Sequence, residues 1–228
     1  IEIIQANRKC AMFAVATGRR LDGALKILKK HNIPFPDVLI TSLGTEIHYA
    51  PDLKADKVWA DHIDHLWNPK RIHRLIRTLP GLKVQPKQEQ NIFKISYFID
   101  PEKAPELNDI NHFLLRHDQS VNVIQSFGQF LDITPTRASK GMALRWVNDQ
   151  WDIPLENTLT AGGSGADEDL MRGNTMAVVV ANRHMEELSD LSNIEHIYFA
   201  KKPYAAGIIE ALDYYDFFQT CGVTQYEK

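Results

Sequence analysis

The stretch Thr160-Ala-Gly-Gly-Ser-Gly-Ala-Asp-Glu-Asp-Leu-Met-Arg-Gly173 decides the fold, because a strand-like run ends in a glycine turn that opens onto three consecutive acids. A strand that leads into an acidic helix start presents carboxylate oxygens at one edge of a sheet, where they suit a divalent cation beside a phosphate. A Thr-Gly-Arg turn at 17–19 and a Ser-Lys-Gly at 139–141 accompany this stretch. The three motifs together are the candidate chemistry of the chain.

Composition indicates a globular protein with a full core. The chain has 228 residues, of which 44% are hydrophobic and 24% charged, and its net charge is only -3. Such a balance favours neither a nucleic acid nor a membrane surface as partner. No apolar run approaches the roughly 18 residues that span a bilayer, and the two cysteines, Cys10 and Cys221, lack metal or redox spacing. We therefore expect a soluble protein of the reducing cytoplasm.

Strands alternate with helices at both ends of the chain. An apolar strand at 11–16 is followed by leucines at helical spacing over 21–28 and by a second strand at 37–41. This unit predicts an α/β fold with a doubly wound parallel sheet, whose ligands bind at the carboxyl ends of the strands. The alternation resumes with a helix at 140–147, strands at 158–161, 177–181 and 196–199, and a helix at 204–217.

The middle of the chain has a different rhythm. Helical patterns at 59–66, 72–79 and 107–114 enclose an alternating strand at 92–99, and two further strands follow at 121–126 and 130–133. We interpret residues 47–135 as an inserted α+β subdomain. The core is then formed by residues 1–46 and 136–228.

Each motif also has a purely structural interpretation. Thr17 and the Gly18 amide can hold phosphate oxygens, or the hydroxyl can simply cap the turn. Lys140 can neutralise a phosphoryl group, although an isolated lysine usually lies on the surface. The acids at 167–169 can bind a cation or complement the dipole of a helix start. A dinucleotide-binding loop is disfavoured, since G-x-G-x-x-G is not matched and the acids would repel a pyrophosphate.

The motifs, in this order, resemble those of the haloacid dehalogenase (HAD) phosphohydrolase superfamily. The insertion lies between the motifs at 17–19 and 139–141, which match the second and third motifs of that superfamily. Thr41-Ser-Leu-Gly-Thr-Glu-Ile47, Phe130-Leu-Asp-Ile-Thr-Pro135 and Ser139-Lys-Gly resemble the sucrose-phosphate phosphatase family. The stretches at 162–169, 171–175 and 178–184 look most like the phosphatase-like C-terminal domain fused to bacterial sucrose-phosphate synthases. The likeness covers essentially the whole chain.

The resemblance implies a two-step phosphoryl transfer. An Asp nucleophile forms an aspartyl phosphate, a second Asp protonates the leaving sugar oxygen, and Mg²⁺ bridges carboxylate and phosphate. By match to the motifs, Thr17 and Gly18 would bind phosphate, Lys140 would stabilise its charge, and Asp167 would serve the metal. The insertion would be the cap that selects the sugar. The candidates for contacts with sugar hydroxyls are Glu46, Lys94 and Gln125.

The departures from the family pattern argue against catalysis by this chain alone. The nucleophile motif D-x-D-x-T should precede Ile1 and is not in this chain, so we expect that the chain alone cannot run the reaction. Burial of the strand that carries this motif would contribute roughly 6 to 12 kcal/mol to the free energy of unfolding. The free energy of unfolding of a whole domain is only about 5 to 15 kcal/mol. We therefore expect that the isolated chain is not an autonomous folding unit.

The metal motif departs as well. The family pattern is G-D-x-x-N-D, and Gly163 and Ala166 stand where the first Asp and the Asn are expected. Substitution by Asp169 is doubtful, because neighbours two apart on a helix point to different sides. Weakened metal binding is expected. The alternative to a phosphatase is a non-catalytic regulatory or docking domain, fused to the glycosyltransferase of a sucrose-phosphate synthase; a plain nucleotide-binding α/β domain fits least.

Overall fold

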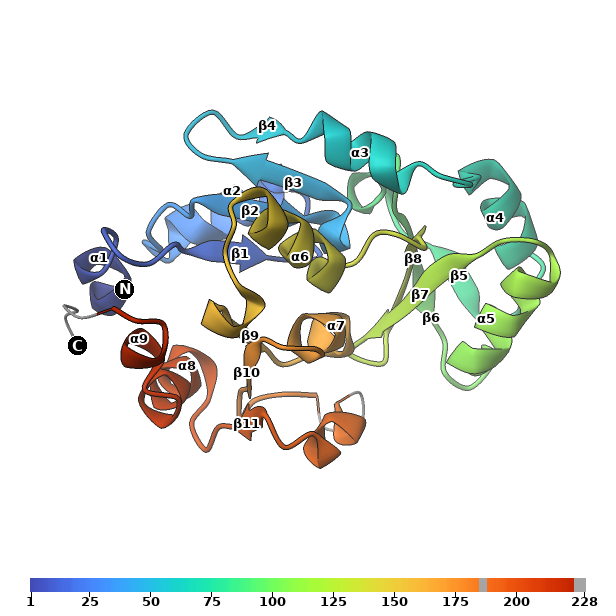
Figure 1. Cartoon of the computed structure of the whole chain (residues 1–228). Helices are drawn as coiled ribbons and strands as arrows, with labels where there is room; N and C mark the ends of the chain where they lie inside the picture. The colour runs from blue at the N-terminus through green and yellow to red at the C-terminus, as the bar shows by residue number, and fades with distance from the viewer. Residues whose placement is uncertain (185–187, 224–228) are drawn as a thin grey trace.

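The computed structural model describes residues 1–184 and 188–223 and shows two lobes, a core and a cap formed by the inserted segment (Figure 1). The first part of the core contains α1 (Glu2–Ala6), β1 (Ala14–Ala16), α2 (Leu21–Lys30), β2 (Val38–Thr41), the 3-10 turn η1 (Ser42–Gly44), β3 (Glu46–Tyr49), β4 (Lys54–Ala55) and α3 (Lys57–Ile63). Its second part contains α6 (Lys140–Gln150), η3 (Leu155–Asn157), β9 (Leu159–Gly162), η4 (Gly165–Asp167), α7 (Glu168–Met171), β10 (Met176–Val179), η5 (Ser189–Asn193), β11 (Ile197–Phe199), α8 (Tyr204–Tyr214) and α9 (Phe217–Thr220).

The core confirms the predicted α/β class but divides its parallel strands between two sheets. β1 and β2 are parallel, and β3 and β4 extend their sheet in antiparallel fashion in the order β1-β2-β3-β4. β9, β10 and β11 form a separate parallel sheet in the order β11-β10-β9. β1 and β9 thus each lie at the end of a sheet, where a single doubly wound sheet was expected.

The two end strands are less covered than the strand beside them. All four residues of β2 are buried, as expected of a strand covered on both faces. In β1, Ala14 is exposed and Val15 and Ala16 are only half-buried, although all three side chains are apolar. Three of the four residues of β9 are half-buried as well. Along its outer edge, a strand at the end of an open sheet has backbone N–H and C=O groups without ladder partners, so a further strand could pair there.

The cap is an antiparallel sheet with helices on one face. It contains α4 (Pro69–Ile76), β5 (Leu82–Val84), η2 (Lys87–Glu89), β6 (Ile95–Ile99), α5 (Leu107–Arg116), β7 (Val121–Ser126) and β8 (Phe130–Pro135), and its strand order is β5-β6-β8-β7. Tyr97 and Leu131 pack with the helix residues Ile72 and Ile110 in the cap's hydrophobic cluster. Because side chains alternate along a strand, Ser96 and Asp132, which are paired across β6 and β8, face the other way.

The structure shifts the start of the cap relative to the sequence prediction of residue 47. β3 returns beside β2, and Ile47, Trp59 and Ile63 belong to the hydrophobic cluster of the core together with Ala143 and Val179. The segment from β3 to α3 is therefore part of the core. Apolar spacing predicted the α3 helix correctly, but spacing does not say against which lobe a helix packs.

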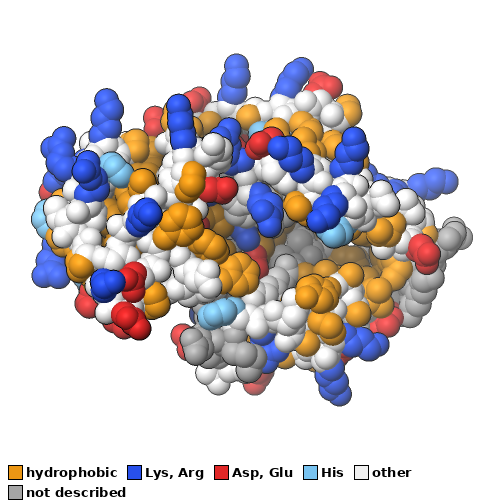
Figure 2. All heavy atoms as spheres, turned by 180° about the vertical axis from the view of Figure 1, so that it is seen from behind, with side chains coloured by type: hydrophobic (Ala, Val, Ile, Leu, Met, Phe, Trp, Pro, Cys, Tyr) orange, Lys and Arg blue, Asp and Glu red, His pale blue; other side chains and the backbone are white. Residues whose placement is uncertain are grey.

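Charge is spread over the surface of the molecule. On the reverse face, Lys and Arg side chains are scattered among acids and apolar groups (Figure 2). Among the residues that the structure describes, none of the helices combines the length and the hydropathy needed to cross a membrane.

Candidate active site

A buried ion pair joins two of the predicted motifs. Lys140 is the first residue of α6, which begins after Ser139 because the Ser139 Oγ accepts a hydrogen bond from the Met142 amide at 3.0 Å. The Lys140 Nζ donates to the Asp167 Oδ1 at 2.7 Å, and the two side chains are 7% and 15% exposed. Buried charges of this kind are stable only when paired, so this lysine is not the ordinary surface residue that its isolated position suggested.

Asp167 is also held by its own turn. Its Oδ2 accepts from the amides of Gly163 and Ser164, at 3.0 and 3.1 Å, and from the Ser164 hydroxyl at 3.1 Å. Burial by itself would raise the pKa of Asp167, but the Lys140 ammonium and these amides outweigh it and hold the pKa below its usual value. The carboxylate is therefore anionic at neutral pH.

A local signal explains why Asp167, of the three acids, points inward. Ser164 and Asp167 form a reciprocal capping box at the start of η4. The spacing S-x-x-D at 164–167 is typical of such a helix start, and the sequence prediction did not use it. Asp167, the acid that the family resemblance assigns to the metal, is thus also the acid that completes the helix start.

The other two acids have partners of their own. Glu168 accepts from the Arg172 guanidinium at 2.5 and 2.7 Å. The Asp169 Oδ2 accepts from the Ser139 hydroxyl, and its Oδ1 lies 3.5 Å from the Arg145 Nη1. Asp169 therefore contacts Ser139, the residue before Lys140. It does not lie beside Asp167, and this agrees with the expectation that residues two apart on a helix point to different sides.

Magnesium does not fit the described residues by themselves. Within residues 1–184 and 188–223, no three His, Cys, Asp or Glu side chains surround a common point. Both oxygens of Asp167 already accept hydrogen bonds, one of them from three donors. A cation would have to displace an ammonium or find further carboxylates, so we derive no chemical step through a metal.

The Thr17 turn lies at the carboxyl end of β1 and contacts the site through η1. The Thr17 Oγ1 accepts from the Arg19 amide at 3.2 Å, which is the turn-capping role, and a hydroxyl that accepts a hydrogen bond can also donate its own proton. The Leu43 amide donates to the Thr17 carbonyl at 3.1 Å. At Gly44, where φ is +89°, a Cβ would stand 2.1 Å from the Ser139 carbonyl oxygen. The backbone of η1 thus links the Thr17 turn to the start of α6.

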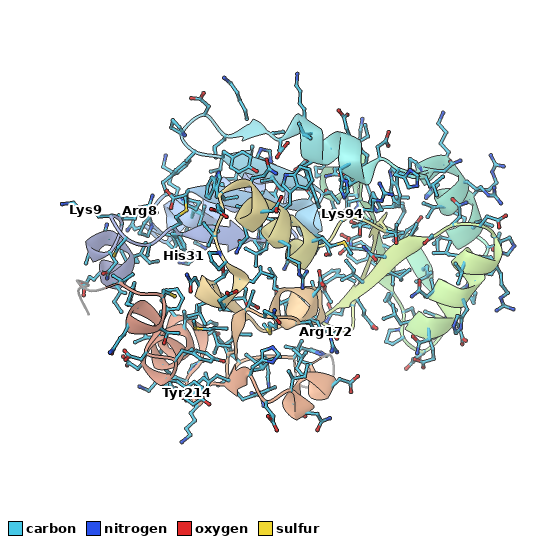
Figure 3. The ribbon with its side chains drawn as sticks, viewed as in Figure 1. Arg8, Lys9, His31, Lys94, Arg172 and Tyr214 are labelled. Atoms are coloured by element: carbon cyan, nitrogen blue, oxygen red, sulfur yellow. The ribbon has the colours of Figure 1, made fainter. Side chains whose placement is uncertain are left out.

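One predicted cap residue reaches this turn. The Lys94 Nζ lies 3.4 Å from the Gly18 carbonyl oxygen in the core and 3.6 Å from the Asp132 Oδ1 in the cap. The Ser96 hydroxyl donates to the same Asp132 oxygen. Lys94 is only 4% exposed and lies where the cap meets the core (Figure 3). Ser96 and Asp132 were not among the sequence candidates, although period-2 alternation with Tyr97 and Leu131 places them on this face.

The structure does not bring Glu46 and Gln125 to Lys94. Glu46 starts β3 in the core and accepts from the hydroxyls of Thr41 and Ser42, at 2.8 and 3.2 Å. The neighbouring His48, followed by these hydroxyls, holds the pKa of Glu46 below its usual value against the effect of burial. Gln125 pairs with Leu131, one position away from the Ile124–Asp132 pair, so it projects to the opposite face of the cap sheet from Asp132, and there it lines the pocket that Asn122 and Ser139 also line.

A parallel α/β core, a cap inserted after α3, and a buried lysine–aspartate pair beside the carboxyl end of β9 describe the class of protein. The fold is that of haloacid dehalogenase-like proteins: a solved HAD subclass IIB sugar phosphatase superposes with a TM-score of 0.64 over 94% of this chain and 89% of its own, at 14% identity. The chain belongs to the sucrose-6F-phosphate phosphohydrolase family, whose sequence model matches residues 2–216. The superfamily and family predicted from the motifs are thus confirmed.

Solved and curated relatives agree with this assignment. The sucrose-phosphatase of Synechocystis sp. PCC6803, solved with sucrose and phosphate, superposes with a TM-score of 0.89 at 30% identity over 94% of this chain and 88% of that one. A probable sucrose-phosphatase 2 of Arabidopsis thaliana is 30% identical over 92% of this chain and 52% of its own length. A mannosylfructose-phosphate phosphatase of Agrobacterium fabrum is 28% identical over 86% and 79%. The chain spans about half the length of the plant relatives.

Proposed function

We propose that this chain supplies the phosphate and sugar sites of a phosphatase that acts on sucrose 6-phosphate or a closely related sugar phosphate. The observation that carries the proposal is the buried Lys140–Asp167 pair, held beside the Thr17 turn by the Gly44 contact. In this role the Thr17 hydroxyl and the Gly18 amide donate to phosphate oxygens. Lys140, fixed by Asp167, stabilises the charge that develops on the phosphoryl group.

The proposed sugar site is the face of the cap that carries Lys94, Ser96 and Asp132. A buried hydroxyl, a carboxylate and an ammonium can together donate to and accept from sugar hydroxyls. The Lys94 contact with Gly18 supports this location, because it puts the cap polar groups next to the phosphate turn. The names of the relatives supply two substrates to compare, sucrose phosphate and mannosylfructose phosphate.

We propose that the nucleophile comes with a further parallel strand between β1 and β9. Each of these strands lies at the end of its sheet, with apolar side chains that are only partly covered. An Asp on that strand would attack phosphorus while the bond to the sugar oxygen breaks and a second Asp protonates that oxygen. Water would then hydrolyse the aspartyl phosphate and release inorganic phosphate. Any magnesium ion would need carboxylates from this strand in addition to Asp167.

The test is phosphate release by the natural full-length polypeptide. Sucrose 6-phosphate, mannosylfructose phosphate and glucose 6-phosphate are assayed with Mg²⁺ and with a chelator. We expect release from at least one of the two disaccharide phosphates, at least about tenfold faster than from glucose 6-phosphate. Absence of release from all three substrates would refute the phosphatase proposal.

A non-catalytic docking domain of a sucrose-phosphate synthase is the second candidate, with a fused glycosyltransferase as its partner. It is favoured by the three acids at 167–169, each of which is engaged by a separate donor. On this proposal the full-length protein binds sucrose 6-phosphate, as measured by calorimetry, without turning it over. Both candidate functions would operate in the cytoplasm.

A further inference from the structure

Asn122 ties the edge strand of the cap to the connection that returns to the core. It lies in β7, opposite Thr134 of β8. Its side-chain Nδ2 is 3.0 Å from the Pro135 carbonyl oxygen, 3.3 Å from that of Thr136 and 3.0 Å from that of Ala138. Two amide hydrogens thus serve three acceptors along a single short connection.

This connection ends at the site lysine. The Ala138 carbonyl accepts a second hydrogen bond from the Thr134 Oγ1 at 2.8 Å, and the Ala138 side chain is completely buried. Ser139 follows and caps α6, and Lys140 is the next residue. The bonds from the cap strands are therefore made two residues before the ammonium that contacts Asp167.

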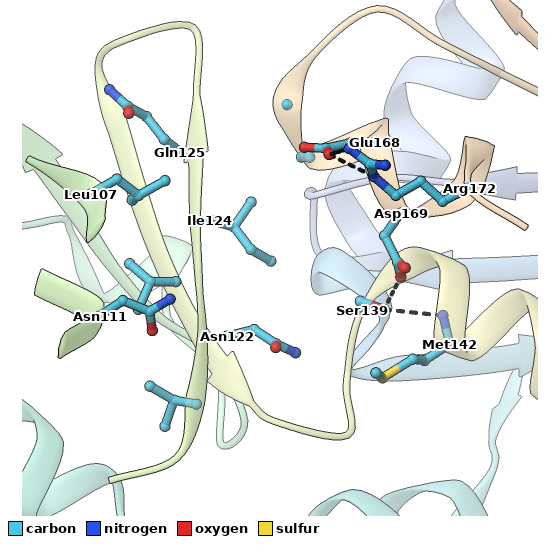
Figure 4. A pocket seen from close by; sticks show the side chains of 14 residues that line it. Leu107, Asn111, Asn122, Ile124, Gln125, Ser139, Met142, Glu168, Asp169 and Arg172 are labelled. Carbon is cyan, nitrogen blue, oxygen red and sulfur yellow. Dashed lines mark hydrogen bonds and ion pairs between the residues drawn. The ribbon is translucent and has the colours of Figure 1, made fainter. Parts of the chain in front are cut away.

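The same side chain lies in a pocket between the lobes. The pocket has a volume of about 410 Å³ and is lined on the cap side by Asn111 and Asn122 and on the core side by Ser139, Asp169 and Arg172. Asn122 projects from β7 toward the side on which Ser139 lies (Figure 4). Solvent in such a pocket can compete with the 135–138 carbonyls for the Asn122 amide. The hydrogen bonds of Asn122 therefore persist only while β7 stays close to the 135–138 connection.

We propose that Asn122 is a positioning residue for Lys140, which couples the placement of the cap to that of the site lysine. If the cap moves relative to the core, β7 either carries the 135–138 carbonyls with it or leaves them without the Asn122 amide, while the Pro135 carbonyl keeps the Ala138 amide and the Ala138 carbonyl keeps the Thr134 hydroxyl. Loss of a donor to a buried carbonyl is costly, so we expect the carbonyls to follow β7 and the start of α6 to move with the cap. The catalytic part of this inference rests on the proposed phosphatase function.

The test compares Asn122→Asp with Asn111→Asp in the full-length polypeptide. Both substitutions place a carboxylate in the same pocket, but only the first removes the amide that donates to the connection. Backbone hydrogen exchange at residues 136–142 should be about tenfold faster in Asn122→Asp and unchanged in Asn111→Asp. Equal exchange in the two variants would overturn the proposal. This measurement needs no turnover, so it stays decisive if the phosphatase proposal fails.

Kinetics separates positioning from mere stability. In folded Asn122→Asp, kcat for phosphate release should fall at least about tenfold with KM for the sugar phosphate changed less than about threefold, since the lysine acts on the developing charge. Loss of folded protein at unchanged kcat per folded molecule would contradict a positioning role. If Asn122→Asp does not fold, Thr134→Val removes the other bond to Ala138 and should accelerate exchange at 136–142 in the same direction; no acceleration there would reject the proposal.

Discussion

The part of the chain that the structure describes holds two buried lysine–aspartate pairs, one in the core and one in the cap, and they are built differently. In the core, the Lys140 Nζ donates to Asp167 at 2.7 Å, and the turn around Asp167 satisfies its other oxygen. In the cap, Lys94 lies 3.6 Å from Asp132 and 3.4 Å from a core carbonyl. The core pair is closed within one lobe, whereas the cap pair is looser and spans both lobes. The first is suited to fix a charge and the second to respond to a ligand.

The largest expected effect is that of Lys140→Met. Without the ammonium, Asp167 remains buried and uncompensated, which should lower the free energy of unfolding by about 3 kcal/mol. If the proposed phosphatase function holds, phosphate release by the full-length polypeptide should fall by about 10³-fold. Thermal unfolding and steady-state kinetics measure the two effects, with the exposed Lys54→Met as control. If Lys140→Met were milder than Lys94→Met in both, the difference drawn between the pairs would be reversed.

Asp167→Asn should come next and should show in the pH dependence of stability. The pKa of Asp167 is lowered by folding from its usual value of 3.8, so its contribution is complete above that value and is lost as pH falls through the lower folded pKa. The variant should be about 2 to 3 kcal/mol less stable at pH 7. Between about pH 5 and 2 its stability should decline less steeply than that of the wild type. Parallel denaturation curves across this range would show that Asp167 is not the titrating group.

Lys94→Met should have a smaller effect on stability and a distinct effect on binding. Asp132 keeps its hydrogen bond from the Ser96 hydroxyl in this variant, so the free energy of unfolding should fall by only about 1 to 2 kcal/mol. The KM for the sugar phosphate should rise about tenfold, because a ground-state contact is removed. A fall in kcat at constant KM would instead assign to Lys94 the charge-stabilising role proposed for Lys140.

The smallest effect should come from Gln125→Ala. Gln125 projects away from the face that carries Asp132, so stability should change by less than about 0.5 kcal/mol and KM should not change. Denaturant unfolding and the same kinetic assay check both values. A clear rise in KM would return Gln125 to the sugar site and would mean that the cap presents its other face to the ligand.

Much of the fold was accessible from sequence patterns. Helical spacing predicted α2 and α5, and the strands predicted at 121–126 and 130–133, on either side of the Gly128 turn, are close to the observed bounds of β7 and β8. β3 and β5 were missed, since strands of three or four residues carry few alternating positions. The start of the cap was also displaced, because the partners of the α3 helix lie far away along the chain.

The candidate site was predicted in part. Lys140 and Asp167 were found by motif, and the structure pairs them. Glu46 was selected as a polar residue near the cap, but its carboxylate is engaged by the Thr41 and Ser42 hydroxyls of the core. Asn122 was not found at all, since an asparagine in a strand has no local signal that distinguishes it.

The sequence by itself determined the α/β class and the family, because these follow from local periodicity and short motifs, and its motifs selected Lys140 and Asp167 as candidates. Only the tertiary structure decided which of three acids pairs with Lys140, which cap residues face the core, and how Asn122 joins the lobes. Those outcomes depend on strand register and on hydrogen bonds between residues 13 to 76 positions apart, as in the bonds of Asn122 and the contact between Lys94 and Gly18. Such distances lie beyond the reach of any periodic pattern.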